Sequence, residues 1–423
     1  MPLPSSSSSP SSTRPRPRLD QSRTLIPGLP NDVAALILSF VPYPQISRLK
    51  STCKSWYAFL SSKTLISLRH KRNRNSLSHL LCIFPQDPSI SNPYLFDPET
   101  LSWLSLPPMP CNPHVYGLCN FAAVALGPYI YVLGGSAFDT RSYPLDRPMP
   151  SSSAFRYSFV KSTWERLSPM LSPRGSFACA AMPGSNQIIV AGGGSRHTLF
   201  SAAGSRMSSV EIYDVERDEW RAMDGLPRFR AGCVGLLVRN EQEREFWVMG
   251  GYGGSRTVSG ILPVDEYYRD AVVMELRNND GGGKWRLVGD MWGQEERAKL
   301  GKIAAIDDDC GSSAFFMLDG NQILRYEMAP NLWQKESTLP RRVPCEKSSG
   351  FVALNGELHV MTLLEGFSSS DTSSQTRKQR KGNKSMMIQI YHPMKRTWRS
   401  IVSRVPFIKE LDFRTSVMCT IRV

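Results

Sequence analysis

The sequence of 423 residues contains no apolar stretch that approaches the roughly 18–20 residues a helix needs to cross a bilayer. Its nine cysteines are odd in number, scattered along the chain and never spaced as Cys-x-x-Cys. This distribution argues against a disulfide framework and against a structural zinc site. We therefore expect free thiols in a reducing compartment, no membrane partner, and a location in the cytoplasm, the nucleus or both.

Signatures of catalysis are also missing. The six histidines lie far apart, and none takes part in an HxH or HExxH spacing that would bring metal ligands together. There is no GxSxG nucleophile motif and no Walker loop, and the glycine runs 192–194 and 281–283 fit a strand end and a hairpin turn. We expect neither an enzyme nor a bound cofactor or metal.

The formal net charge of +14 suggests a nucleic-acid partner until the charges are located. Residues 1–78 hold 12 basic and 2 acidic side chains, and 377–384 holds five basic side chains and no acid. The rest of the chain carries a net charge of −1. Because nucleic-acid affinity depends on clustered neutralisation of phosphates, this near-neutral body predicts no nucleic-acid partner.

Two segments are predicted to be disordered. Residues 1–23 are rich in serine, proline and arginine, with Asp20 as the single acid, and cannot bury enough apolar area to offset the entropy of ordering. The alternative for this tail is an organellar transit peptide, which has a similar composition. The second segment is a basic loop, 367–385, whose run RKQRKGNK is either a solvated loop tip or a nuclear import signal.

A helical pattern covers residues 24–70. Asn31 or Asp32 is expected to cap the first helix, and Pro42 and Pro44 are expected to stop it. Its apolar side chains recur at helical spacing and form one face: Val33, Leu36, Ile37, Phe40 and Val41. A second stripe consists of Ile46, Leu49, Cys53, Trp56, Tyr57 and Leu60. Two or three short helices are too few to bury both faces, so a partner is expected to complete part of this surface.

The order of residues over about 40 positions of this segment resembles an F-box. It has the opening Leu29-Pro30 with Asp32 two residues later, the break at Pro42, and the closing Cys53-Lys54-x-Trp56. The alternative is an ordinary helical cap on a larger domain. The resemblance implies docking on a Skp-type adaptor of a cullin ubiquitin ligase. By residue match it places that contact on Leu29, Pro30, Ile37, Val41, Leu49, Cys53, Trp56 and Leu60.

From residue 79 to residue 423, short β-rich runs alternate with turns rich in glycine, proline and serine, which predicts an all-β body. Three apolar runs end in a glycine pair, at 134–135, 192–193 and 250–251, and each is followed by a hairpin that carries a tryptophan. Six such tryptophans lie 48 to 65 residues apart, at Trp103, Trp164, Trp220, Trp285, Trp333 and Trp398. This period predicts six repeats of one four-stranded unit plus a long loop.

The unit resembles the kelch repeat, in which a glycine pair closes the second strand and aromatic residues mark the third and fourth. Two units depart from that pattern, with Asp319-Gly320 and 363–366 in place of the glycine pair. The first unit offers only three strands, and an unassigned apolar strand at 415–421 can complete it and remove both open edges. The predicted fold class is a small all-α F-box module followed by an all-β, six-bladed kelch-type β-propeller closed by a C-terminal strand.

In such a propeller, the loop between the second and third strands of a blade and the connection to the next blade emerge on one face. These loops are long at 136–153, 195–208, 252–268 and 367–385. The connections carry arginines: Arg174, Arg228, Arg230, Arg297, Arg341 and Arg342. Kelch domains that this chain resembles bind partner peptides on that face, and arginine suits capture of carboxylate or phosphate. The alternative is that these arginines brace the connections by hydrogen bonds to carbonyls.

Together the two resemblances imply the substrate-binding subunit of a ubiquitin ligase, which acts through proximity and not through catalysis of its own. The expected partners are a Skp-type adaptor with the cullin ligase core and a protein substrate with an acidic or phosphorylated segment. Two alternatives stay open. A kelch scaffold outside a ligase would not need residues 25–68, and a propeller enzyme with a metal would need convergent ligands that the sequence does not place together.

Overall fold

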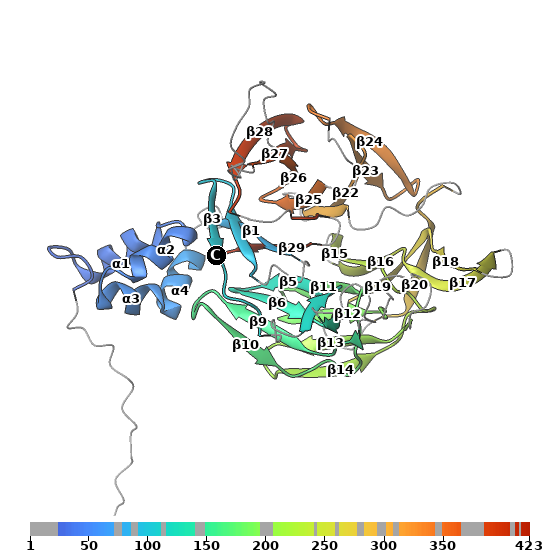
Figure 1. Cartoon of the computed structure of the whole chain (residues 1–423), viewed down its shortest axis with the longest axis horizontal. Helices are drawn as coiled ribbons and strands as arrows, with labels where there is room; N and C mark the ends of the chain where they lie inside the picture. The colour runs from blue at the N-terminus through green and yellow to red at the C-terminus, as the bar shows by residue number, and fades with distance from the viewer. Residues whose placement is uncertain are drawn as a thin grey trace, which may run out of the picture. The chain divides into compact units, whose positions relative to one another are not determined.

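The structure, a computed structural model, divides into two compact units, Met1–Ser76 and Leu77–Val423, which we call the helical unit and the β unit (Figure 1). The predicted tail 1–23 and residues 367–384 of the predicted loop lie outside the described residues. The described residues are 24–71, 78–85, 92–110, 116–139, 149–194, 206–240, 243–258, 262–276, 283–293, 302–307, 313–342, 349–364, 385–406, 411–413 and 416–423.

The described part of the helical unit forms four short helices, α1 (Asn31–Ser39), α2 (Tyr43–Lys50), α3 (Lys54–Leu60) and α4 (Lys63–Lys71). Helix α1 packs against α4, and α3 packs against both α2 and α4. The buried side chains of this unit are mostly small or aliphatic and include Ala34, Ala35, Leu38, Ile46, Leu60 and Leu65. The prediction of two or three helices was too low, because residues 51–53 divide the second apolar stripe between α2 and α3 and a further helix, α4, follows.

Prolines and caps at the start of these helices differ from the sequence expectation. Pro42 is the residue that precedes α2, but Pro44 lies inside the first turn of α2 and does not end a helix. Proline is tolerated there because the first backbone N–H groups of a helix have no intrahelical acceptor. The expected cap by Asn31 or Asp32 is wrong, since Pro30 occupies that position, and Asn31 Oδ1 instead accepts a hydrogen bond from Leu25 N at 2.9 Å.

The described part of the β unit contains six four-stranded antiparallel sheets, numbered here from the first in the chain. Sheet 1 consists of β29 (Val417–Arg422), β1 (His79–Phe84), β2 (Tyr94–Asp97) and β3 (Ser102–Ser105). Sheet 2 consists of β5 (Ala122–Leu126), β6 (Tyr129–Leu133), β9 (Ala154–Ser158) and β10 (Thr163–Leu167). Sheet 3 consists of β11 (Ala178–Met182), β12 (Gln187–Ala191), β13 (Val210–Asp214) and β14 (Glu219–Met223). Sheet 4 consists of β15 (Val234–Asn240), β16 (Glu243–Met249), β19 (Asp270–Glu275) and β20 (Trp285–Asp290). Sheet 5 consists of β21 (Ile303–Asp307), β22 (Ser313–Asp319), β23 (Gln322–Glu327) and β24 (Leu332–Thr338). Sheet 6 consists of β25 (Ser349–Leu354), β26 (Glu357–Leu364), β27 (Ser385–His392) and β28 (Thr397–Arg404).

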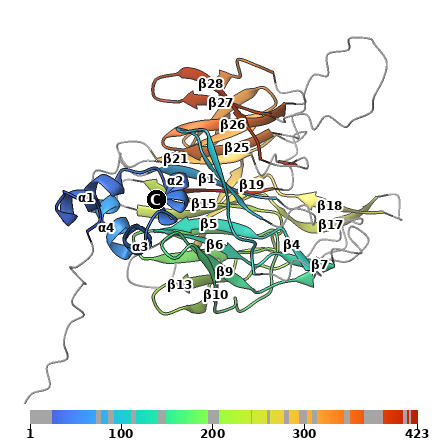
Figure 2. The same ribbon diagram turned by 60° about the vertical axis from the view of Figure 1, so that its left-hand side comes forward.

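Two of the predicted long loops contain strands of their own. Strands β7 (Ser136–Asp139) and β8 (Met149–Pro150) lie between β6 and β9 and form a three-stranded sheet with β4 (Tyr116–Cys119). Strands β17 (Tyr252–Val258) and β18 (Leu262–Tyr267) form a hairpin between β16 and β19. In Figure 2, β7, with its partner β4, and the β17–β18 hairpin lie on the same side of the β unit, as expected for insertions between the second and third strands of sheets 2 and 4.

Each sheet has one end strand that lies beside the end strand of the next sheet: β29 in sheet 1, then β5, β11, β15, β21 and β25. Strand β29 lies beside β5, β5 beside β11, β11 beside β15, β15 beside β21, β21 beside β25, and β25 beside β29 (Figure 1). The last strand of the chain, β29, pairs antiparallel with β1, with Leu81 opposite Thr420 and Cys82 opposite Cys419. Sheet 1 therefore contains residues from both ends of the β unit.

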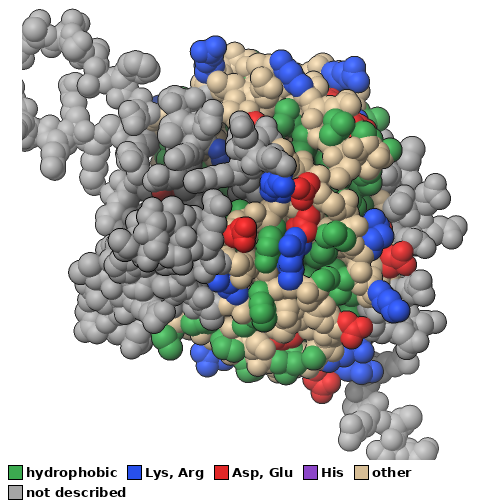
Figure 3. Space-filling view, turned by 90° about the vertical axis from the view of Figure 1, so that its right-hand side faces the viewer, with side chains coloured by type: hydrophobic (Ala, Val, Ile, Leu, Met, Phe, Trp, Pro, Cys, Tyr) green, Lys and Arg blue, Asp and Glu red, His purple; other side chains and the backbone are tan. Residues whose placement is uncertain are grey.

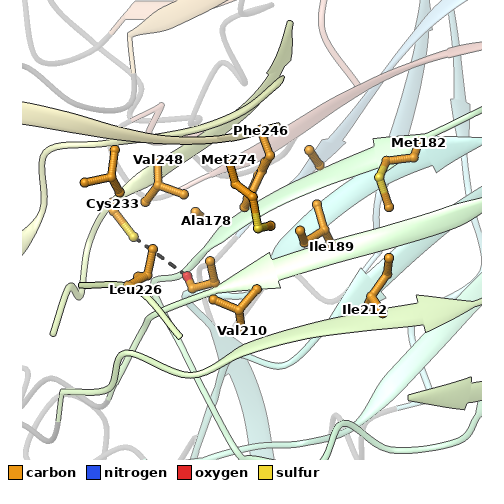
Figure 4. Close-up of a cluster of buried hydrophobic side chains, with 13 residues drawn as sticks. Ala178, Met182, Ile189, Val210, Ile212, Leu226, Cys233, Phe246, Val248 and Met274 are labelled. Carbon is orange, nitrogen blue, oxygen red and sulfur yellow. Dashed lines mark hydrogen bonds between the residues drawn. The ribbon is translucent and has the colours of Figure 1, made fainter. Parts of the chain in front are cut away.

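The core of the β unit lies between adjacent sheets. Figure 4 shows one such cluster, in which Ile189 and Val210 of sheet 3 lie with Phe246, Val248 and Met274 of sheet 4. The second strands are buried on both faces, so they appear in the sequence as continuous apolar runs and do not alternate apolar with polar residues. Full burial of an aliphatic or aromatic side chain of this size contributes about 1.5–3 kcal/mol.

The six predicted tryptophans all lie on the outermost strands, β3, β10, β14, β20, β24 and β28. Five of them donate Nε1–H to an oxygen of the preceding sheet or its connection, as Trp220 does to Ser168 O at 2.9 Å. The preceding sheet for Trp103 is the last one in the chain, because Trp103 Nε1 donates to Ser403 Oγ at 2.9 Å. Trp333 Nε1 is the exception and has no hydrogen-bond partner among the described residues.

The glycine pairs end the second strands of sheets 2, 3 and 4, where the chain passes close to the connection from that sheet to the next. Gly192 has φ +66°, and a Cβ atom added there would lie 2.4 Å from Arg230 O. Gly134 has the same arrangement, with Arg174 O at 2.5 Å from the added atom. Both positions therefore require glycine, for the backbone angle and for the close approach.

Two buried histidines predict a pH-dependent stability. Burial lowers the pKa of His79 and of His359 to about 4. In the unfolded chain these histidines have the usual pKa of about 6.5, so between pH 6.5 and about 4 the unfolded chain binds protons that the folded chain does not. The free energy of unfolding therefore falls as the pH drops through this range, by roughly a few kcal/mol in total. Urea denaturation at pH 7 and pH 5 measures the difference. A His79→Gln/His359→Gln variant should show a smaller one, and an equal difference in both proteins would contradict this origin.

Candidate functional site

The helical unit carries a patch of exposed apolar side chains that a folded domain normally buries. We call the exposed apolar side chains on and just before α1 the helical patch, and it consists of Leu29, Val33, Leu36, Ile37 and Phe40; Tyr57 of α3 is exposed as well. Phe40 and Tyr57 are the most exposed, at 57% and 60%. Apolar patches of this kind mark surfaces that bind another macromolecule.

The sequence grouped the apolar residues of α1 on one helical face but did not give its direction. The structure turns this face outward at Val33, Leu36, Ile37 and Phe40, while the opposite face, with Leu38 and two alanines, packs in the core of the unit. Small buried residues allow α1 to pack closely against α4 and leave the larger apolar side chains at the surface.

The predicted adaptor-binding residues lie in three different environments. Leu29, Pro30, Ile37 and Cys53 are exposed; Val41, Leu49 and Trp56 are half-buried; and Leu60 is buried, with 2% of its surface exposed. Leu60 therefore belongs to the core of the helical unit and offers no contact surface. The sequence match did not include the exposed residues Val33, Leu36, Phe40 and Tyr57, although the two helical stripes had already singled out all four.

Two side chains hold the segments around α1 in place. Trp56 Nε1 donates to Leu25 O at 2.6 Å, which fixes the chain ahead of α1. The buried Arg69 guanidinium donates to Val41 O, just after α1. Burial lowers the pKa of Arg69 to about 10, so this side chain is still protonated at neutral pH. Both ends of the helical patch are therefore tied to the rest of the unit.

Two of the predicted substrate-binding arginines are fully buried. Arg174 donates to Gly192 O at 2.9 Å and forms an ion pair with Glu211 of β13. Arg230 makes the same pair of contacts one sheet later, to Gly250 O at 2.7 Å and to Asp270 of β19 at 2.7 Å. These two guanidiniums brace the connections between sheets, and they have no surface left for a partner.

The other predicted arginines differ from this pair. Arg228 is half-exposed and shares Asp270 with Arg230. Arg341 and Arg342 are exposed, and the backbone of Arg341 is held by the Gln389 side chain, which accepts from Arg341 N at 2.8 Å and donates to Arg341 O at 2.9 Å. Arg297 lies outside the described residues. The described arginines thus separate into a buried bracing pair and three exposed residues, Arg228, Arg341 and Arg342.

The described residues show no group of three or more His, Cys, Asp and Glu side chains that could hold a metal ion. No helix within the described ranges is long and apolar enough to span a membrane. The six described cysteines are free thiols, and burial raises the pKa of most of them, that of Cys419 to about 12, which makes them poor nucleophiles at neutral pH. On the face shown in Figure 3, basic and acidic side chains are interspersed among exposed apolar ones.

Comparisons with known proteins match both units. The F-box domain model matches residues 26–68, and the Kelch motif model matches 117–171 and 173–227. The chain is 75% identical to F-box/kelch-repeat protein OR23 of Arabidopsis thaliana over 421 residues, which covers 97% of this chain and 94% of the relative. F-box/kelch-repeat protein SKIP30 of the same plant is 31% identical over 220 residues, 51% of this chain and 59% of that protein. F-box protein AFR, also from Arabidopsis thaliana, is 30% identical over 243 residues, 52% of this chain and 55% of that protein.

The combination of an F-box and kelch repeats is, in general, that of substrate-recognition adaptors of SCF-type ubiquitin ligases. The match to OR23 extends over nearly the whole of both chains and includes the helical unit and the β unit. This protein belongs to the F-box/kelch-repeat family.

Proposed function

We propose that this protein is the substrate receptor of an SCF-type ubiquitin ligase, in which the helical patch docks on a Skp-type adaptor and the β unit holds the protein substrate. The observation that carries the proposal is the outward apolar face of α1, in the segment that matches the F-box model. Six exposed apolar side chains in so small a unit place apolar surface in water, which is unfavourable in free energy. Binding to a partner would remove this cost.

We infer further that the β unit is a closed six-bladed propeller. Three contacts support closure: the pairing of β29 with β1, the hydrogen bond from Trp103 to Ser403, and the position of β25 beside β29. A closed ring has no open sheet edge at its ends, which protects against pairing with other chains. It also holds the loops on one face at fixed positions for a partner.

The mechanism that follows is binding and orientation. The adaptor and cullin core supply the ubiquitin chemistry, and this chain contributes by holding a substrate lysine close to it for long enough to react. The alternative is a kelch scaffold that acts outside a ligase, in which case the helical patch would have a different partner or pack on another part of its own assembly.

Adaptor binding by the purified full chain tests the proposal. We expect Ile37→Asp or Phe40→Asp to weaken binding to a plant Skp-type adaptor by at least about thirtyfold, because each places a charge where an apolar side chain is buried on binding. Isothermal titration calorimetry measures the dissociation constants. Leu287→Asp, at an exposed apolar position of β20, is the matched control and should bind like the wild type. Failure of the wild type to bind would favour the scaffold.

A further inference from the structure

The connection from sheet 3 to sheet 4 carries two exposed side chains that its counterpart does not have. When Arg230 is aligned with its structural equivalent Arg174, Arg228 and Phe229 fall on Ser172 and Pro173 of the connection from sheet 2 to sheet 3. The bracing guanidinium makes the same contacts in both connections, but the second carboxylate oxygen is used differently. Glu211 Oε2 accepts a hydrogen bond from Leu171 N at 2.8 Å, whereas Asp270 Oδ2 accepts one from Arg228. Arg228 therefore helps to brace its connection while 44% of its side chain stays exposed.

Arg228 is held in one orientation by two contacts. Its guanidinium carbon lies 3.7 Å from the centre of the Tyr268 ring, and its Nη2 atom donates to Asp270 Oδ2. Arg230 lies on the same ring at 4.8 Å and donates to the other oxygen of Asp270 at 2.7 Å. Two guanidiniums therefore share one carboxylate, which leaves one net positive charge, and only Arg228 is exposed to solvent, at 44% of its side chain.

The surrounding backbone is rigid. Ala231 and Tyr252 exchange two backbone hydrogen bonds, each of 2.8 Å, which join the connection to the start of β17. Tyr268 N donates to Gly251 O at 2.8 Å, which fixes the end of the same hairpin. The Tyr252 and Tyr267 rings lie 5.7 Å apart and pack the two strands of the hairpin together. A ligand that binds here would meet a preformed surface and lose little affinity to ordering.

Apolar area lies in the same region. Phe229 is 55% exposed and Tyr267 is 39% exposed, although the aromatic residues around them, Tyr252 and Tyr268, are buried or half-buried. Aromatic and arginine side chains fixed by their neighbours are the residue types that dominate binding energy at protein interfaces. We call Arg228, Phe229, Tyr267 and Tyr268 the Arg228 patch.

We propose that the Arg228 patch binds a short segment of the substrate in which a carboxylate side chain lies beside an apolar one. The carboxylate would accept hydrogen bonds from Arg228, and the apolar side chain would lie on Phe229 and Tyr267. Of the two guanidiniums that share Asp270 only Arg228 is exposed, and one guanidinium suits the two oxygens of one carboxylate, whereas a phosphate group, with a charge of about −1.5 to −2 at neutral pH, is typically bound by a cluster of arginines. This inference rests on the proposed function as a substrate receptor and names the chemical class of segment that it recognises.

Peptide selection on the immobilised full chain tests the inference. We expect a random phage-displayed peptide library to yield binders with Asp or Glu within two residues of an aromatic or aliphatic residue. Synthetic copies of these peptides should bind Arg228→Ser and Phe229→Ser about ten- to a hundredfold more weakly than wild type, as measured by fluorescence polarisation. Arg228→Ser introduces the serine found in the counterpart, Phe229→Ser removes the aromatic ring, and unchanged thermal unfolding would show that both variants fold.

Matched controls separate the patch from exposure alone. Arg325→Ser removes another half-exposed arginine, and Leu171→Ser removes an exposed apolar residue of the connection from sheet 2 to sheet 3. Neither variant should bind the selected peptides more weakly than the wild type does. In a further set of synthetic peptides, the acidic residue is replaced by Gln or by phosphoserine. The inference is overturned if no acidic binder is selected, if binding to Arg228→Ser is unchanged, or if the phosphoserine peptide binds more tightly than the carboxylate one.

Failure of this inference can be told apart from failure of the proposed function. Adaptor binding is measured on the same protein preparations and depends on the helical unit, so a chain that binds the adaptor but selects no acidic peptide keeps its role as a receptor and loses only the Arg228 patch. A chain that selects acidic peptides but no adaptor keeps the patch and loses the ligase role.

Discussion

A Glu211→Ala variant is expected to lose about 3–5 kcal/mol of free energy of unfolding, because it leaves a buried charge without its partner. Glu211 and Arg174 are almost completely excluded from solvent. The same carboxylate accepts hydrogen bonds from Leu171 N at 2.8 Å and Ser172 N at 3.0 Å, so its removal also leaves two backbone N–H groups without an acceptor. The loss can be measured by urea denaturation followed by tryptophan fluorescence.

Two further variants test the cause of this loss. Glu165→Ala breaks an ion pair with Arg156 near the surface of sheet 2 and should cost less than about 1 kcal/mol, because water screens and replaces that contact. The double variant Arg174→Met/Glu211→Leu removes both charges and should recover much of the stability, since apolar side chains of similar size can replace a buried ion pair. If Glu211→Ala unfolds within 1 kcal/mol of wild type, the pair does not brace the connection.

Removal of β29 is the second change with a large expected effect. A chain that ends at Ser416 loses β29, one of the two strands that pair with β1, together with the buried side chains of Ile421 and Val423. Full burial of each aliphatic side chain contributes about 1.5–3 kcal/mol, so the loss approaches the total stability of about 5–15 kcal/mol typical of a domain. We expect the truncated protein to be insoluble or to lose cooperative unfolding, because β1 gains an exposed edge and β25 loses its neighbour.

The control for this truncation is Arg422→Ala. Arg422 lies on β29 but is exposed, so its replacement keeps the strand and should change the melting temperature by no more than a few degrees. Differential scanning calorimetry of the full chain, the truncated chain and Arg422→Ala gives the comparison. A truncated protein that melts cooperatively at the wild-type temperature would show that β29 does not close a ring.

The repeat architecture of the β unit could be predicted because its signals are local. A glycine pair and a tryptophan are needed at fixed points of each sheet, and these residues stand out in the sequence even where the loops between them vary in length. The strands inside the predicted loops could not be predicted in this way. Strand β8 has only two residues, one of them a proline, and β7 pairs with β4, which lies in the preceding connection.

The burial of the arginines was not accessible from the sequence. Arg228 and Arg230 lie two residues apart in one connection and both pair with Asp270, but only Arg230 lies wholly inside, where it also donates to Gly250 O. The direction of the apolar face of α1 raises the same difficulty. The spacing of its apolar residues indicates a helical face. Whether this face points outward depends on how Leu38 and the alanines of α1 pack within the unit, which the spacing does not contain.

The composition of the assembly formed in plant cells tests whether the helical patch brings this protein into a ubiquitin ligase. Tagged wild-type chain and the Ile37→Asp/Phe40→Asp variant, expressed at equal levels, are purified by affinity, and their Skp-type adaptor and cullin contents are quantified by mass spectrometry. We expect adaptor in near-equimolar amount with the wild type and at least about thirtyfold less with the variant. Absence of adaptor and cullin from the wild-type assembly, or equal amounts with both proteins, would contradict this expectation.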